Sequence, residues 1–148
     1  MASGVVNILQ YLFGSETGYL CLGRIKIGKA IEQANTGLKV VLKEGWDLTR
    51  DSHYQLCNRF AWAWKLTSLG VPVVLVYLGF LNAREMQDQG EPFATHAAWE
   101  SCLKSHGKDR VPAEAWGKRF AINGVPMWFL IKSMELPDNI TANSKSYY

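Results

Sequence analysis

An unbroken run of apolar residues, Val73–Leu81, constrains the fold more than any other part of this sequence. The run is rich in β-branched and aromatic residues, and it lacks the alternation of polar and apolar residues that marks a strand with one wet face. Gly70 and Pro72 precede it and end any helix before it. We therefore predict a strand that is covered on both faces and is the most buried strand of the chain. The apolar stretch is about half of the roughly 20 residues that a membrane-spanning helix needs, so no membrane partner is expected.

Two helices are predicted before this strand. In residues 24–42 the apolar side chains recur at intervals of three and four, as they do along one face of an amphipathic helix; they are Ile27, Ile31, Ala34, Leu38 and Val41. Gly45 follows as a stop signal, because glycine readily adopts the left-handed conformation that ends helices. Residues 53–69 form the second predicted helix, with Ser52 as its cap and with apolar side chains around much of its circumference.

A third helix and a hairpin are predicted after the strand. A polar loop over 82–92 leads to a helix over 95–106, which Thr95 can cap and which turns Trp99, Cys102 and Leu103 inward. One helical turn is predicted within 113–118. Asn123-Gly124, the dipeptide that best accommodates a tight hairpin turn, then separates strands over 120–122 and 127–134. Pro126 predicts that the second of these strands lies at a sheet edge or just outside the ladder.

The two ends of the chain differ in what they predict. Residues 1–23 suit two short strands around Gly14-Ser15, and residues 137–148 form a polar tail. The chain of 148 residues, 48% of them hydrophobic, is long enough for one core. We predict one α/β domain over residues 1–136, with a small mixed sheet flanked by helices on both faces.

Charge and cysteine content set weak limits on function. Sixteen Lys and Arg against thirteen Asp and Glu give a net charge of only +3, which permits a nucleic-acid partner without arguing for one. Cys21, Cys57 and Cys102 are an odd number of cysteines, far apart and without zinc-ligand spacing, so we expect a cytoplasmic protein without disulfides. No phosphate-binding or hydrolase motif occurs in the sequence.

The most informative polar residues lie at the start of the second helix. Gln55, Asn58 and Arg59 are spaced i, i+3 and i+4, so they share one face, and Tyr54 lies beside them. Buried polar groups need partners, because each unsatisfied group costs roughly 1–3 kcal/mol. The cluster is therefore either a structural network that ties loop carbonyls to the helix, or the edge of a site in which Arg59 meets an anion.

Two further sets of residues have both a functional and a structural interpretation. Five basic residues could contact phosphates or could form an ordinary solvated surface, since acidic residues are interspersed among them; they are Lys104, Lys108, Arg110, Lys118 and Arg119. The histidines His53, His96 and His106 stand apart, and no metal site is predicted from them. His53 lies near Asp47 and Asp51, where a short polar cluster could form.

The segment Tyr54-Gln55-Leu56-Cys57-Asn58-Arg59-Phe60-Ala61 carries a resemblance to a known family. Its surroundings contribute further matches: Gly45-Trp46, Gly70-Val71-Pro72, Phe80-Leu81-Asn82, Gly90-Glu91-Pro92-Phe93 and Trp99-Glu100. Over about residues 25–119 the chain resembles an uncharacterised bacterial family of restriction-endonuclease-like proteins in the PD-(D/E)XK nuclease superfamily. The resemblance implies a fold similar to part of a restriction-endonuclease-like core, with Gln55 beside a metal site.

That superfamily needs a carboxylate on one strand and a (D/E)xK pair on the next, because the two acidic groups hold the divalent ion that activates water. In residues 1–23, where the resemblance places these strands, Glu16 is the sole acidic residue, and in Gly23-Arg24-Ile25-Lys26 a glycine stands in the acidic position. The resemblance thus implies a truncated or degenerate nuclease-like domain without catalytic residues. Mg²⁺ would bind only if the missing catalytic half were supplied, either by a second chain or by the loop that carries Glu44, Asp47 and Asp51.

Two functions follow as hypotheses. The first is association with DNA without metal-dependent cleavage. The second is a structural or interaction module that forms a homo-oligomer by dimerising through an exposed sheet edge, so that its partner is another protein chain.

Overall fold

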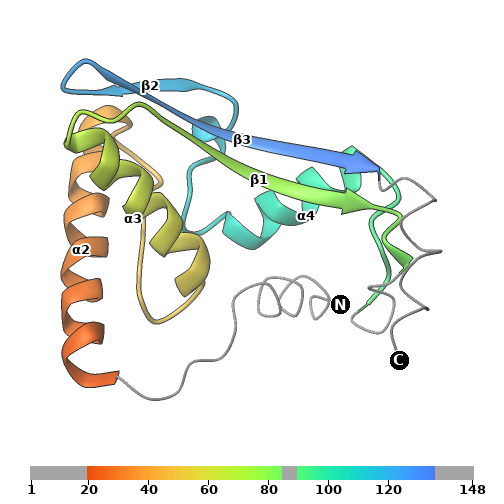
Figure 1. Cartoon of the computed structure of the whole chain (residues 1–148), viewed down its shortest axis with the longest axis horizontal. Coiled ribbons are helices and arrows are strands. Elements are labelled where there is room, and N and C mark those ends of the chain that lie inside the picture. Colours follow the sequence, from red (N-terminus) through yellow and green to blue (C-terminus); the bar gives the residue numbers. More distant parts are fainter. Residues whose placement is uncertain (1–19, 85–89, 136–148) are drawn as a thin grey trace, which may run out of the picture.

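The computed structural model describes residues 20–84 and 90–135 and shows a mixed α/β fold in that part of the chain (Figure 1). The elements follow in the order α2 (Leu20–Val41), α3 (Tyr54–Ser68), β1 (Val73–Leu81), α4 (His96–Gly107), the short 3₁₀ helix η2 (Ala113–Ala115), β2 (Arg119–Ile122) and β3 (Val125–Glu135). This confirms the predicted α/β class with a small mixed sheet, but the helices in the described part of the chain pack against one face of the sheet (Figure 1), whereas helices on both faces were predicted. The predicted first strand and the C-terminal tail lie outside the described residues.

The three strands form one sheet in the order β1-β3-β2. β1 runs parallel to β3, with Val73 opposite Met127, and β2 runs antiparallel to β3. Parallel neighbours need a crossover connection, and α4 lies in the segment that joins β1 to the hairpin. Asn123 and Gly124 have φ angles of 50° and 83°, which confirms the predicted tight turn.

The placement of Pro126 at a sheet edge was wrong, because β3 is the central strand. Pro126 lies opposite Ala121 of β2, and the ladder with β1 begins one residue later, at Met127. At Pro126, β3 therefore pairs with β2 alone. Because proline has no backbone N–H, it could not donate a hydrogen bond to β1, and at this position no such bond is needed.

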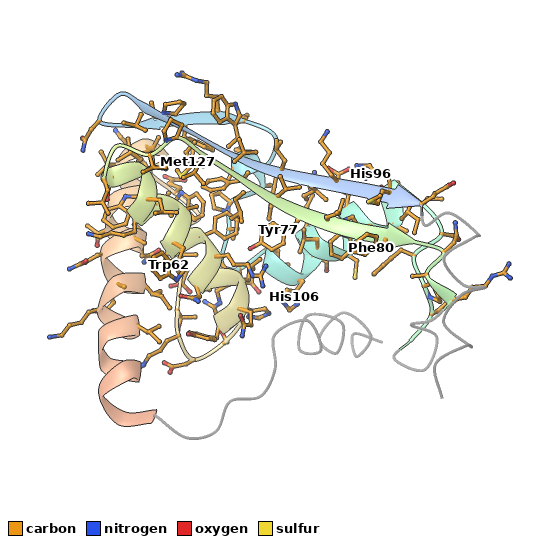
Figure 2. The ribbon with its side chains drawn as sticks, viewed as in Figure 1. Trp62, Tyr77, Phe80, His96, His106 and Met127 are labelled. Atoms are coloured by element: carbon orange, nitrogen blue, oxygen red, sulfur yellow. The ribbon has the colours of Figure 1, made fainter. Side chains whose placement is uncertain are left out.

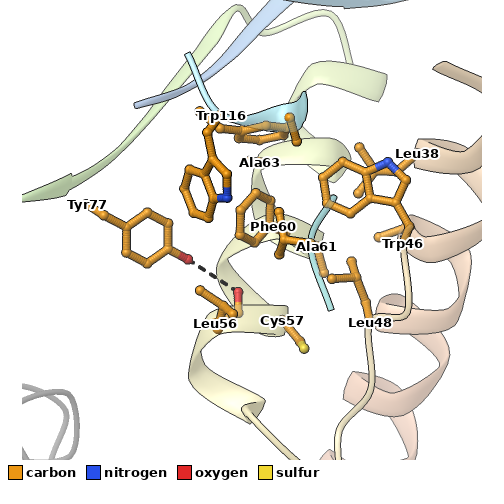
Figure 3. Packing of buried hydrophobic residues seen from close by; sticks show 14 of the residues in the cluster. Leu38, Trp46, Leu48, Leu56, Cys57, Phe60, Ala61, Ala63, Tyr77 and Trp116 are labelled. Atoms are coloured by element: carbon orange, nitrogen blue, oxygen red, sulfur yellow. Dashed lines mark hydrogen bonds between the residues drawn. The ribbon is translucent and has the colours of Figure 1, made fainter. Parts of the chain in front are cut away.

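The core lies between the helices and the sheet face that carries Tyr77 and Phe129, which we call the inner face. Phe60 of α3 is at its centre, with ring centroids 4.7 Å from Phe129 and 5.5 Å from both Trp46 and Trp116 (Figure 3). Buried aromatic side chains each remove about 150–250 Å² from water, so this cluster supplies much of the stabilisation. It fixes α3 beneath the sheet.

α2 confirms the predicted apolar stripe, since Ile31, Ala34 and Leu38 are all buried. The helix begins at Leu20, four residues before the predicted start. The second of the two strands expected within residues 1–23 was therefore wrong from residue 20 onward, where α2 begins. A short apolar run has too few residues for its periodicity to separate a strand from a turn of helix.

The starts of α3 and α4 differ in how they are capped. Thr95 caps α4 as predicted, and its hydroxyl accepts a hydrogen bond of 3.2 Å from the Ala98 N–H. At α3 the predicted cap, Ser52, was wrong. The capping position is His53, which has a left-handed φ of 54° and makes no side-chain cap bond, while the Ser52 carbonyl accepts from the Cys57 thiol.

The second face of the sheet, which we call the outer face, contradicts the prediction of a strand covered on both sides. The side chains of β1 alternate along the strand, so that Tyr77 and Leu81 are buried while Val74, Val76, Leu78 and Phe80 are 44–54% exposed. The described helices pack against the inner face (Figure 1). An apolar sequence permits burial of a strand on both faces. Whether another element covers the second face depends on the rest of the fold.

None of the helices in the described part of the chain is long and apolar enough to cross a membrane.

Candidate functional site

The cluster predicted at the start of α3 is half-buried. Tyr54, Gln55, Asn58 and Arg59 have intermediate exposure, whereas Leu56 and Phe60 of the same helix are buried. Within the part of the chain that the structure describes, no hydrogen bond joins Gln55, Asn58 and Arg59 to one another. Arg59 does lie near Tyr77, and its positive charge opposes, to a smaller extent, the rise in the pKa of Tyr77 that burial causes. The role of this cluster as a site edge stays a prediction.

A cavity of about 360 Å³ lies elsewhere, between α2 and the loop that precedes α3. Its lining mixes charges of both signs and comprises Gly28, Lys29, Ile31, Glu32, Leu48, Thr49, Arg50 and Asp51. Arg50 and Asp51 pair with each other at 3.4 Å. Because the charges offset one another and the α3 cluster does not line it, the cavity favours no particular ligand.

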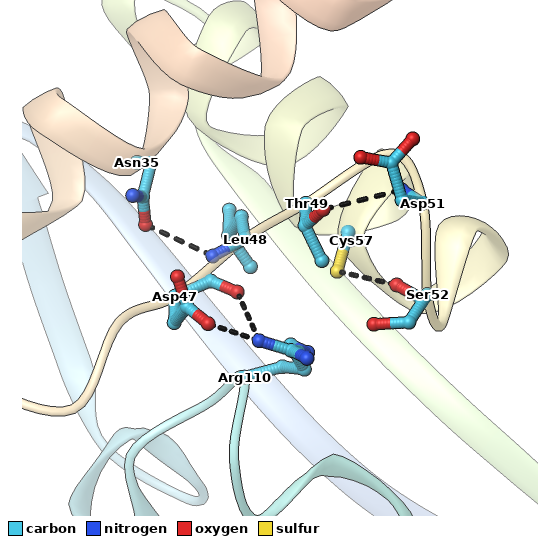
Figure 4. A network of polar contacts seen from close by, with 8 residues as sticks. All are labelled: Asn35, Asp47, Leu48, Thr49, Asp51, Ser52, Cys57 and Arg110. Atoms are coloured by element: carbon cyan, nitrogen blue, oxygen red, sulfur yellow. Dashed lines mark hydrogen bonds and ion pairs between the residues drawn. The ribbon is translucent and has the colours of Figure 1, made fainter.

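A polar network holds the loop between α2 and α3 in place (Figure 4). The side chain of Arg110 pairs with the carboxylate of Asp47, and the Asp47 N–H donates to the Arg110 carbonyl at 3.1 Å. The Asn35 side-chain oxygen accepts from the Leu48 N–H at 3.0 Å. Cys57 beneath this loop is buried, and burial raises the pKa of its thiol, so it is an unreactive core residue.

The five basic residues predicted as phosphate contacts are divided between two regions. Lys104 on α4 pairs with Glu100 at 2.8 Å, and Arg110 pairs with Asp47, so carboxylates offset both charges. Lys108 follows α4 and is exposed. Lys118 and Arg119 lie at β2 and are exposed too, and the Arg119 guanidinium lies 5.7 Å from the centre of the Trp128 ring. Contact of these residues with phosphate stays a prediction.

Within the described part of the chain, no hydrogen bond or ion pair joins His53 to Asp47 or Asp51, which pair with Arg110 and Arg50 instead. The ring of His53 instead packs edge-on against that of His106, with centroids 4.4 Å apart. Burial lowers the pKa of His106, and the nearby His53 lowers it further. Among the residues described, no group of three His, Cys, Asp or Glu side chains is placed to hold a metal ion.

The outer face of the sheet is the feature with the clearest capacity to bind. The strand register places its residues, because paired residues point to the same side. They are Val74, Val76, Leu78 and Phe80 from β1, Trp128, Leu130, Lys132 and Met134 from β3, and Arg119 and Ala121 from β2. Figure 2 labels Phe80 and, from the inner face, Tyr77 and Met127. The face is apolar along β1 and, apart from Lys132, along β3.

The exposure of the outer face was not predicted from the sequence, although one residue indicated it. Lys132 falls inside the strand predicted over 127–134, and a lysine in a strand indicates that its side of the sheet meets water. The exposure of Trp62 on α3, which is 60%, was not predicted either.

Comparison of the chain with protein-family models, with curated proteins and with solved structures gave no significant match. The resemblance of the Tyr54–Ala61 segment to restriction-endonuclease-like proteins therefore stays a prediction.

Proposed function

We propose that this chain is an interaction module that binds another protein surface through the outer face of its sheet. The observation that carries the proposal is the exposure of Val74, Val76, Leu78 and Phe80 on β1, with Met134 beside them on β3. Parallel strands are ordinarily covered on both faces, and β1 and β3 are parallel. Contiguous apolar surface of this kind marks interaction sites on soluble proteins.

The described residues offer weaker support for a catalytic role. Cys57 is buried with a raised thiol pKa, which disfavours a nucleophile. The Asp47 carboxylate is paired with Arg110 in a network that holds a loop. An interaction function requires an exposed binding surface but no reactive group, and the outer face is such a surface.

Association with nucleic acid, as a degenerate nuclease-like domain, is the second candidate. The observation that favours it is Arg119 over the ring of Trp128, with Lys132 on the same face. Aromatic rings with neighbouring cations are the elements of surfaces that bind single strands. Apart from Phe80, the rest of the apolar face is aliphatic or a methionine and cannot stack with bases in that way, so a protein partner is the stronger candidate.

A photo-crosslinking amino acid placed at position 78, in the cells that produce the protein, tests the proposal. Position 40 on α2 is the matched control, because Val40 is 81% exposed but lies outside the sheet. We expect a protein adduct of defined mass at position 78, none at position 40, and loss of the adduct when Val76→Asp is added. Absence of an adduct at position 78, or equal labelling at both positions, would contradict the proposal.

An adduct at position 78 that nuclease removes would instead support the nucleic-acid candidate. A salt titration of DNA binding checks that outcome independently. Phosphate contacts weaken steeply as salt rises, whereas an apolar protein interface does not.

A further inference from the structure

We infer that the partner on the outer face is a second copy of this chain, packed sheet against sheet in a two-fold dimer. This inference rests on the proposed function and names the partner for the same surface. It also selects the outer face, rather than the free edge of β1, as the surface through which two copies meet.

The area of the face is sufficient for such a dimer. β1 and β3 extend side by side over about 30 Å at a spacing of about 4.8 Å, and with the four residues of β2 they make a strip of roughly 350 Å² before side-chain relief is added. Two copies would then bury on the order of 1,000 Å², which is the lower limit for a specific interface. An interface at this limit belongs to the weak or transient class, so dimerisation is to be measured at micromolar protein concentrations and above.

The side chains of the face suit packing against their own copies. Val76, Leu78 and Leu130 lie near the middle of the strip, and none of them carries a polar atom. Two sheets with such faces pack about 10 Å apart, with their strands within roughly 30° of each other. A two-fold axis makes the same patch meet itself, and two-fold dimers are the commonest symmetric assemblies.

The charges of the face are compatible with this arrangement. Arg119 and Lys132 are its charged residues within the described strands, and neither belongs to β1. Arg119 lies on β2, and Lys132 lies on β3 beyond the last residue that pairs with β2. Where the two-fold axis runs along the strands, β3 packs over β3 of the second copy and Lys132 comes near its own copy, but β2 does not extend along the flank of β3 at this position. The flexible stem of Lys132 can extend over that flank, and Arg119 can extend past the edge strand β2, so both charged groups can reach water at the rim of the dimer.

Pairing through the edge of β1 would leave the apolar face uncovered. Edge pairing would join the two sheets into one, with the exposed side chains of both copies on continuous surfaces. Packing of the outer faces buries the same side chains. The exposure of Val74, Val76 and Phe80 therefore favours the face over the edge.

Sedimentation equilibrium over a range of protein concentrations tests the inference. The key variant is Met134→Glu, because Met134 is 46% exposed on the outer face and belongs to the central strand, away from the edge of β1. The matched control is Val40→Glu on α2. We expect the wild type and Val40→Glu to form dimers within the range from micromolar concentrations upward. Met134→Glu should weaken dimerisation at least tenfold, and so should Val76→Asp. Circular dichroism should show that the variants are folded.

Two results would overturn the inference. A wild type that stays monomeric at concentrations far above micromolar would show that the partner is not a second copy. A dimer that persists unchanged in both Met134→Glu and Val76→Asp would place the contact elsewhere, for example at the β1 edge. If the wild type is monomeric while position 78 still forms a protein adduct of another mass, the proposed function holds with a different partner. If position 78 forms no adduct, the proposed function fails as well.

Discussion

The Tyr77 hydroxyl donates a hydrogen bond of 3.4 Å to the backbone carbonyl of Leu56. This contact ties the inner face of β1 to the start of α3 (Figure 3). It lies beside the stacked rings of Tyr77 and Phe60, whose centroids are 6.0 Å apart. Val76, the preceding residue of the same strand, is on the other face and is 44% exposed. One strand thus supplies both the core and the surface that we propose for binding.

Tyr77→Phe should lower the free energy of unfolding near neutral pH by about 1 kcal/mol, because a buried hydrogen bond contributes that order of stability and this one is long. Burial raises the pKa of Tyr77 above its unfolded value. Its contribution is therefore complete below about pH 10, where unfolded tyrosine is still protonated, and falls as the pH rises further. Urea unfolding between pH 7 and 11 should show a shallower alkaline loss for Tyr77→Phe than for the wild type. If the control Tyr54→Phe showed an equally shallow loss of unfolding free energy at alkaline pH, the result would contradict this account.

The His53–His106 pair should make stability fall at acidic pH. The pKa of His106 is lowered by burial and by His53, so the folded state favours the neutral ring. Stability from this source is present above the unfolded pKa, about 6.5, and is lost as the pH falls through the lower folded value. His106→Gln should flatten the dependence of the unfolding free energy on pH between 7 and 5. A pH dependence in the His106→Gln protein that equals that of the wild type would contradict this origin of the acidic loss of stability.

Gly79→Ala should destabilise the protein by about 1–3 kcal/mol through overpacking. A methyl group at this inward position would lie 2.8 Å from ring carbons of Trp99, whose indole N–H donates to the Lys132 carbonyl. In a Trp99→Leu background the same substitution should cost less, and a double-mutant cycle from urea unfolding measures the difference. Equal costs in the two backgrounds would show that the Trp99 ring does not limit the space at Gly79.

Much of the local structure follows from short sequence signals. The bounds of β1 match the prediction, and Thr95 and Asn123-Gly124 take the cap and turn conformations that their side chains favour. In each case the physical cause lies within a few residues of the chain. His53 is different, because its left-handed backbone at the start of α3 accompanies packing against His106, a residue distant in the sequence.

The outer face could not be predicted as the candidate site, because its exposure depends on which elements pack against the sheet. A run of apolar residues is the same whether one or both of its faces are covered, so the exposure of Val76 and Leu78 could not be predicted from β1 alone. Trp46 shows the converse case. It lies in a segment predicted as a loop, yet its ring is buried against Phe60 and Phe129.

The most direct test of the central claim, that one face of β1 is core and the other is a self-binding surface, is the concentration dependence of the urea midpoint. A dimer that forms only from folded chains raises the midpoint as protein concentration rises. The account predicts this rise for the wild type. It predicts that Val76→Asp unfolds cooperatively, with a midpoint independent of concentration and close to that of the dilute wild type. A Val76→Asp protein that is unfolded without urea would show that the outer face is core. A midpoint that rises with concentration as much in Val76→Asp as in the wild type would show that the outer face is not where the copies meet.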